Sequence, residues 1–101
     1  MNVRNSGRLP FLADEAVVEV PAHVEGGAIK PVEIDALTPH QTGLVAHVSA
    51  YESLALSAAL RGGERRVVEA LLAHPLIGQY DLAQRLAASL LAANAQYLSW
   101  T

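Results

Sequence analysis

The sequence contains no cysteine among its 101 residues. A chain without cysteine forms no disulfide, holds no metal through thiolates and has no cysteine nucleophile, which fits a reducing compartment. Residues 1–11 also lack the apolar block of about 7–15 residues that a secretory signal requires. We therefore expect a cytoplasmic location.

Charged residues are scarce, at 17% of the chain against the roughly 25% of an ordinary soluble domain. Seven basic residues against ten acidic ones give a net charge of −3, and the basic residues do not cluster. We therefore expect no nucleic-acid partner. Apolar residues make up 51% of the chain, which excludes disorder, and the length fits one small domain or a piece of a larger protein.

The charge shortage is concentrated in two segments. Residues 38–60 contain a single charge, Glu52, and residues 86–101 contain none. The second segment is shorter than the roughly 20 residues that span a bilayer, so we expect packed helices and no membrane partner. A domain this small does not bury so much apolar surface alone, which predicts a covering partner, either a missing part of the polypeptide or a second subunit in a homo-oligomer.

The hydrophobic pattern predicts an α+β fold, in which a β-hairpin-like segment precedes three helices. The β segment covers about 12–36, and the helices cover about 38–61, 64–73 and 81–98. Thr38 is expected to cap the first helix in a capping box with Gln41, and Gly62-Gly63 to end it. Asp81 is expected to cap the third helix.

Alternation in the β segment places Ala16, Val18 and Val20 on one face of a strand. Glu15, Val17 and Glu19 lie on the other face. Gly26-Gly27 offers a tight turn, so we expect the strand over 15–20 to return as a hairpin through 29–34.

The sequence predicts no catalytic residue and no metal site. The four histidines lack the helical spacing of metal ligands, and no H-E-x-x-H, G-x-S-x-G or G-x-G-x-x-G pattern is present. Glu15 and Glu19 are too far apart along a strand to act as an acid and base pair, so we interpret them as solvated carboxylates.

One stretch is more specific than composition. The sequence NVRNSG over 2–7, followed by LADEAVVEVP over 12–21, resembles the start of the C-terminal region of the 6-phospho-β-glucosidases in glycoside hydrolase family 4. The likeness continues in order through His74-Pro75-Leu76 to NAQYL over 94–98. Arg8 departs from the family pattern, which commonly has a small residue there.

The resemblance implies the C-terminal region of a Rossmann-containing, NAD-dependent glycosidase. Such enzymes hydrolyse phosphorylated glycosides by oxidation, elimination, addition and reduction, using NAD and Mn²⁺ that are bound upstream of this region. The Rossmann domain is absent from this chain, so we expect no cofactor to bind it and no activity from it alone. The resemblance places Asn5 and Gly7 near the substrate pocket, as substrate-binding residues.

Two alternatives stay open at this stage. The first is a free-standing, non-catalytic helical module for interaction or dimerisation. The second is the tail of a 2-hydroxy acid dehydrogenase, which would not explain the NVRNSG and VEVP sequences.

Overall fold

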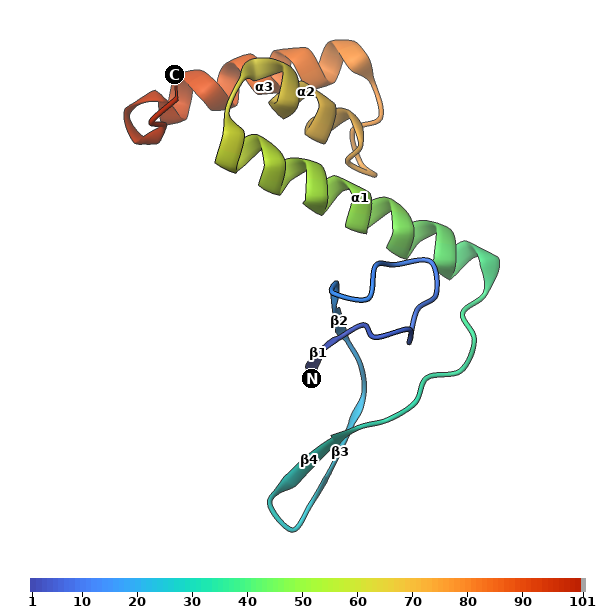
Figure 1. The fold of residues 1–101 in the computed structure, drawn as a ribbon. Coiled ribbons are helices and arrows are strands. Elements are labelled where there is room, and N and C mark those ends of the chain that lie inside the picture. Colours follow the sequence, from blue (N-terminus) through green and yellow to red (C-terminus); the bar gives the residue numbers. More distant parts are fainter. Residues whose placement is uncertain (101) are drawn as a thin grey trace. The chain divides into compact units, whose positions relative to one another are not determined.

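The computed structural model describes residues 1–100 and confirms the α+β fold, with two small antiparallel sheets followed by three helices (Figure 1). The chain divides into two compact units, a β unit over Met1–Thr42 and a helical unit that starts at Gly43. The sequence analysis treats the chain as a single domain, whereas its contacts separate the strands from most of the helical residues.

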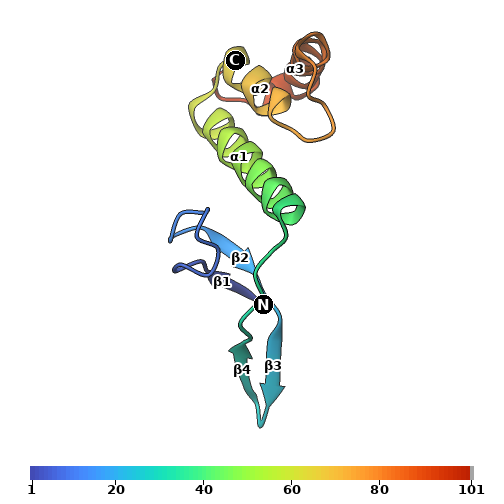
Figure 2. The same cartoon turned by 90° about the vertical axis from the view of Figure 1, so that its right-hand side faces the viewer.

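The β unit contains four short strands, each paired with one neighbour. β1 (Asn2–Arg4) pairs with β2 (Val17–Glu19), and β3 (Ala22–Glu25) pairs with β4 (Ala28–Pro31), as Figure 2 shows. As alternation predicts, Val18 and Val20 are buried, together with Leu9, while Val17 is 71% exposed.

The expected hairpin is correct in its turn and wrong in its strands. Gly26 and Gly27 have φ values of 57° and 81°, the positive values that a two-residue hairpin turn requires. The strand that enters the turn is β3, however, and β2 pairs with β1 instead. The sequence analysis missed β1 because its three residues are too short a run for alternation to identify a strand.

The three helices lie close to their expected ranges. α1 covers Pro39–Arg61, α2 covers Glu64–Leu72 and α3 covers Tyr80–Asn94, followed by a 3₁₀ turn, η1, over Ala95–Tyr97. The capping box is confirmed, because the Thr38 amide donates to Gln41 Oε1 at 2.9 Å and the Gln41 amide donates to Thr38 Oγ1 at 3.4 Å. The expected cap at Asp81 is wrong, because Gln79 is the N-cap and Asp81 lies in the first turn of α3.

The core of the helical unit lies between α2 and α3. Val68 of α2 and the fully buried Ala83 and Ala87 of α3 form its centre. Leu90 of α3, by contrast, is 46% exposed. Alanine lets two helix backbones approach closely, so the small residues occupy the contact and the leucines flank it.

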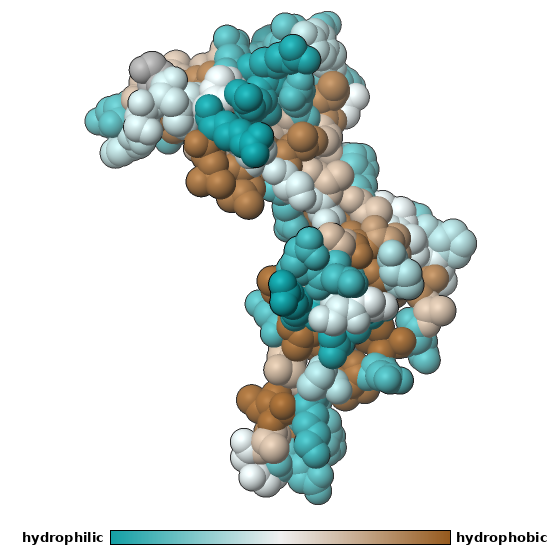
Figure 3. All heavy atoms as spheres, viewed as in Figure 1, coloured by the Kyte–Doolittle hydropathy of each residue, from teal (hydrophilic) through white to brown (hydrophobic). Residues whose placement is uncertain are grey.

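α1 is long, apolar and largely uncovered. Ala58 is its one buried residue, while Leu56 and Leu60 are 61% and 75% exposed. Apolar atoms reach the surface on the helices and on the β3–β4 hairpin (Figure 3). By length and composition α1 is also the one helix within residues 1–100 that could cross a membrane, a test that core helices of soluble proteins pass as well.

Candidate functional site

The segment that carries the predicted substrate-binding residues is a tight turn directly after β1. The Arg8 amide donates to the Asn5 carbonyl at 3.0 Å, and Ser6 and Gly7 at the centre have φ values of 45° and 82°. Two consecutive positive φ values define a type I′ turn, which glycine adopts easily and serine adopts at a cost. Ser6 is therefore held in a backbone conformation that serine does not favour.

The Asn5 side chain is fully buried and supports this turn from the interior of the β unit. Its Nδ2 donates to the carbonyls of Leu9, Leu12 and Ala13 at 2.9, 3.1 and 3.1 Å. Its Oδ1 accepts from the Leu9 amide at 2.8 Å. Every polar atom of the side chain is thus used inside the loop over 5–13, which we call the Asn5 loop. A side chain in this position shapes the loop and is not accessible to a sugar hydroxyl.

Gly7, by contrast, lies on the outside of the turn. It is exposed, and a Cβ built on it would meet no atom within 4 Å. Ser6, Gly7 and Arg8 line an open hollow of about 480 Å³, which Pro31, Val32 and Glu33 close on the other side. The structure therefore separates the two predicted residues, with Asn5 inside the loop and Gly7 at the surface.

Arg8 and Glu33 also face this hollow, and the sequence analysis assigned neither of them to a site. The Arg8 Nη1 donates to the carbonyls of Arg4 and Asn5 at 2.9 and 3.2 Å, which fixes the guanidinium over the turn. The departure of Arg8 from the family pattern was the available signal for it. Glu33 lies beyond the hairpin, and no local pattern connects it to the turn.

The glutamate and histidine residues that the sequence analysis considered lie mostly at the surface. Glu15 and Glu19 are exposed, as are His40 and His47. His23 lies 3.7 Å from Glu25 at the surface. Within residues 1–100, no three histidine or acidic residues are arranged to hold a metal ion.

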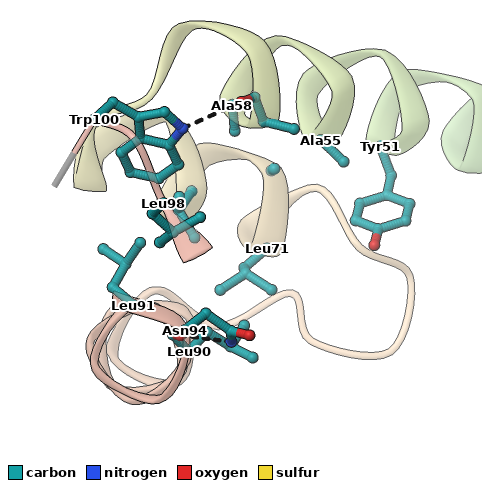
Figure 4. A pocket seen from close by; sticks show the side chains of 12 residues that line it. Tyr51, Ala55, Ala58, Leu71, Leu90, Leu91, Asn94, Leu98 and Trp100 are labelled. Carbon is teal, nitrogen blue, oxygen red and sulfur yellow. Dashed lines mark hydrogen bonds between the residues drawn. The ribbon is translucent and has the colours of Figure 1, made fainter. Parts of the chain in front are cut away.

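The helical unit contains a second hollow, of about 230 Å³, between α1, α2, α3 and the C-terminal residues (Figure 4). Its walls are mostly apolar, with Tyr51, Asn94 and Trp100 around them. The Trp100 Nε1 donates to the Ala59 carbonyl at 3.2 Å, and the Asn94 Nδ2 donates to the Leu90 carbonyl at 2.8 Å. The Trp100 and Asn94 donors are thus engaged with backbone, and most of the remaining lining is apolar.

The fold and the turn together define the class of the chain. Within residues 1–100 the strands are all antiparallel, so there is no parallel β-α-β unit for a dinucleotide. The described part of the chain is thus an α+β structure that carries a shaped loop. The profile of the family 4 glycosyl hydrolase C-terminal domain matches residues 1–77, and the chain belongs to this family.

Relatives of known function agree with the family. The chain is 30% identical over 98 residues to the 6-phospho-beta-glucosidase BglT of Thermotoga maritima, which covers 97% of the chain and 24% of the relative. It is 28% identical to the phospho-alpha-glucosidase PagL of Clostridium acetobutylicum, over 92% of the chain and 21% of the relative. The chain therefore spans about a quarter of the length of its curated relatives.

Solved structures give the same result. A 6-phospho-alpha-glucosidase from gut microorganisms, in complex with NAD and glucose-6-phosphate, superposes with a TM-score of 0.80 at 26% identity, over 98% of this chain and 22% of that one. The 6-phospho-beta glucosidase from Thermotoga maritima superposes with a TM-score of 0.78 at 29% identity, over 99% of this chain and 25% of that one. The resemblance seen in the sequence is thereby confirmed.

Proposed function

We propose that the chain is the C-terminal part of an NAD- and Mn²⁺-dependent 6-phospho-β-glucosidase, and that it supports one wall of the substrate pocket. Membership of the family and the names of the relatives support this proposal. The observation that carries it is the Asn5 loop, in which a fully buried side chain fixes an exposed turn.

Within this proposal Asn5 acts as a positioning residue and Gly7 as the residue that meets the substrate. A glycine without neighbours lets a sugar approach the backbone closely, and the Ser6 hydroxyl can donate to or accept from sugar hydroxyls. The Arg8 guanidinium on the same hollow adds a cation beside the turn. The turn thus supplies polar contacts and no acid, base or nucleophile.

We propose that NAD and Mn²⁺ bind outside residues 1–100. The described strands form no dinucleotide-binding unit, and the described histidines and acids form no metal-binding group. We assign both cofactors, and with them the oxidation, elimination, addition and reduction, to the part of the polypeptide that precedes this region. The chain alone is expected to be inactive.

The substrate class follows from the relatives, whose names cover 6-phosphoglucosidases of both linkages. We propose the β linkage, because two of the three curated relatives are named for it.

The test is a chimaera in which this chain replaces the C-terminal quarter of the Thermotoga maritima relative. We expect hydrolysis of 4-nitrophenyl 6-phospho-β-D-glucoside that requires NAD and Mn²⁺, and none from the isolated chain. Gly7→Val should lower this activity strongly because it blocks the open side of the turn. Gly27→Val is the matched control, because Gly27 has nearly the same φ of 81° and equally open surroundings, but lies in the hairpin turn.

An inactive chimaera that is folded and binds NAD would contradict the proposal. That result would favour the non-catalytic interaction module, which the exposed leucines of α1 also suggest. Equal losses of activity from Gly7→Val and Gly27→Val would show that the turn at Gly7 does not contact the substrate. The family assignment would not be affected.

A further inference from the structure

β2 and β3 follow each other with only Val20 and Pro21 between them, and the hydrogen bonds of these two residues point to opposite sides. The Val20 carbonyl accepts from the Met1 nitrogen at 2.6 Å, and the Val20 amide donates to the Met1 carbonyl at 2.9 Å. The Pro21 carbonyl accepts from the Val32 amide at 2.9 Å. Hydrogen bonds that alternate between two sides along the chain are typical of a single strand with a neighbouring strand on each edge.

The edge toward β1 is used by the even-numbered residues. The Ala16 carbonyl accepts from the Asn5 amide at 2.7 Å, and Val20 exchanges both of its hydrogen bonds with Met1. If the alternation of every second residue continues into β3, the backbone N–H and C=O groups of Ala22 and Val24 lie on this same edge. Within residues 1–100, no strand pairs with this edge of β3.

The opposite edge of β3 is filled by β4, in the register that pairs Ala22 with Pro31 and Val24 with Ile29. The outer edge of β4 is protected against further pairing, because Pro31 has no N–H to donate and Lys30 brings a charge. Of the two edges of the β3–β4 hairpin, the β3 edge is thus the one able to accept a strand.

We propose that the β3 edge at Ala22 and Val24 binds the stretch of polypeptide that directly precedes Met1, as a continuation of β1. The register of β1 with β2 places the second residue before Met1 opposite Ala22 and the fourth opposite Val24. The hairpin then becomes a three-stranded antiparallel sheet. This inference rests on the proposed function, in which the chain continues a longer polypeptide, as its quarter-length match to the relatives supports.

The stability of the hairpin argues for such a partner. A two-stranded hairpin is marginally stable in water, whereas three strands with an apolar face are stable. The cross-strand pair Val24 and Ile29 is 66% and 58% exposed, so the hairpin gains little from burial at present.

The preceding stretch is favoured over a second copy of the chain as the occupant. Met1 is already hydrogen-bonded at the start of this edge, so each added residue pairs without a new association step. A second copy would have to overcome the entropy of association with the few backbone bonds of two residues.

The absence of native cysteines makes a direct test possible. The chain is extended before Met1 by about six alternating threonine and valine residues, which favour strands. A cysteine at the third position before Met1 is combined with His23→Cys, because these positions form a pair that is not hydrogen-bonded, with Cα atoms about 4.5 Å apart. The matched control has its cysteine one position later, where the side chain points to the opposite face.

We expect mild oxidation to give an intramolecular disulfide at least about fivefold faster from the third position than from the control position. Exchange of the Ala22 and Val24 amides with solvent should also slow relative to the chain that begins at Met1. Equal rates from both positions, disulfides only between chains, or unchanged amide exchange would each overturn the proposal. The circular dichroism of the helices verifies folding, and none of these outcomes depends on glycosidase activity.

Discussion

Replacement of Asn5 by alanine should destabilise the β unit by roughly 3 kcal/mol. The side chain makes four hydrogen bonds to backbone, and two of them, both to Leu9, are fully buried. A net intramolecular hydrogen bond contributes about 1 kcal/mol, with buried ones at the upper end and part-buried ones nearer 0.5 kcal/mol. Leu9 is itself buried, so its amide and carbonyl would lose their partner without gaining water.

Amide hydrogen exchange is the suitable measurement for this variant. Trp100 and all three tyrosines lie in the helical unit, so fluorescence would not report on the β unit. The Ser6 and Val20 amides donate to the Asp14 and Met1 carbonyls at 2.9 Å each. Their protection against exchange should fall about a hundredfold, which corresponds to a loss of about 3 kcal/mol. Ser6→Ala is the control, because no side-chain hydrogen bond of Ser6 is involved. A loss below about threefold in Asn5→Ala would refute the reasoning.

The aspartate variant sharpens the same prediction. Asn5→Asp retains an acceptor for the Leu9 amide but turns an oxygen toward three carbonyl oxygens that now receive N–H groups. Burial and these carbonyls raise the pKa of the new carboxyl above its unfolded value. The variant should therefore be less stable than Asn5→Ala at pH 7 and should recover as the pH falls below the raised pKa, since the protonated acid donates once. Equal stability at both pH values would contradict this account.

Three further substitutions test other elements. Gly7→Ala should cost about 1 kcal/mol in the β unit through its φ of 82°, although the Cβ meets no atom, and amide exchange at Arg8 measures it. Thr38→Val should remove the capping box and cost about 1 kcal/mol, seen as fraying of the first turn of α1 by NMR. Gly62→Ala should lower the melting temperature and shift the Trp100 emission, because the new Cβ would overlap the indole. In a Trp100→Ala background the cost of Gly62→Ala should be smaller. Additive costs of the two substitutions would contradict the overlap.

Local signals account for what the sequence predicted well. Thr38 with Gln41 begins α1, and the glycine pair at 62 and 63, with φ values of 69° and 95°, ends it. Each signal acts within one turn of the chain, so it can be read without knowing what lies nearby in space. The cap predicted for α3 was wrong because the helix begins at Tyr80, before Asp81, and its N-cap Gln79 makes no side-chain hydrogen bond to the helix.

Long-range features could not be derived in the same way. β1 pairs with β2 across the Asn5 loop, and the paired residues are up to 17 positions apart. The role of Asn5 is harder still, since one amide suits both a sugar contact and a structural hydrogen-bond network. Only its zero exposure separates the two. A polar residue in a motif thus indicates that a site is near, without showing which side of the loop it faces.

The apolar surface of α1 connects these observations to the whole protein. Full burial of a leucine contributes roughly 2 kcal/mol, so covering Leu56 and Leu60, at 61% and 75% exposure, would contribute about 3 kcal/mol. This exceeds the capping box of the same helix by about threefold. A helix with one charge in its first 22 residues needs such a cover, because an apolar helix is stable when surrounded. In the proposed enzyme we expect the missing part of the polypeptide or a second subunit to supply this cover.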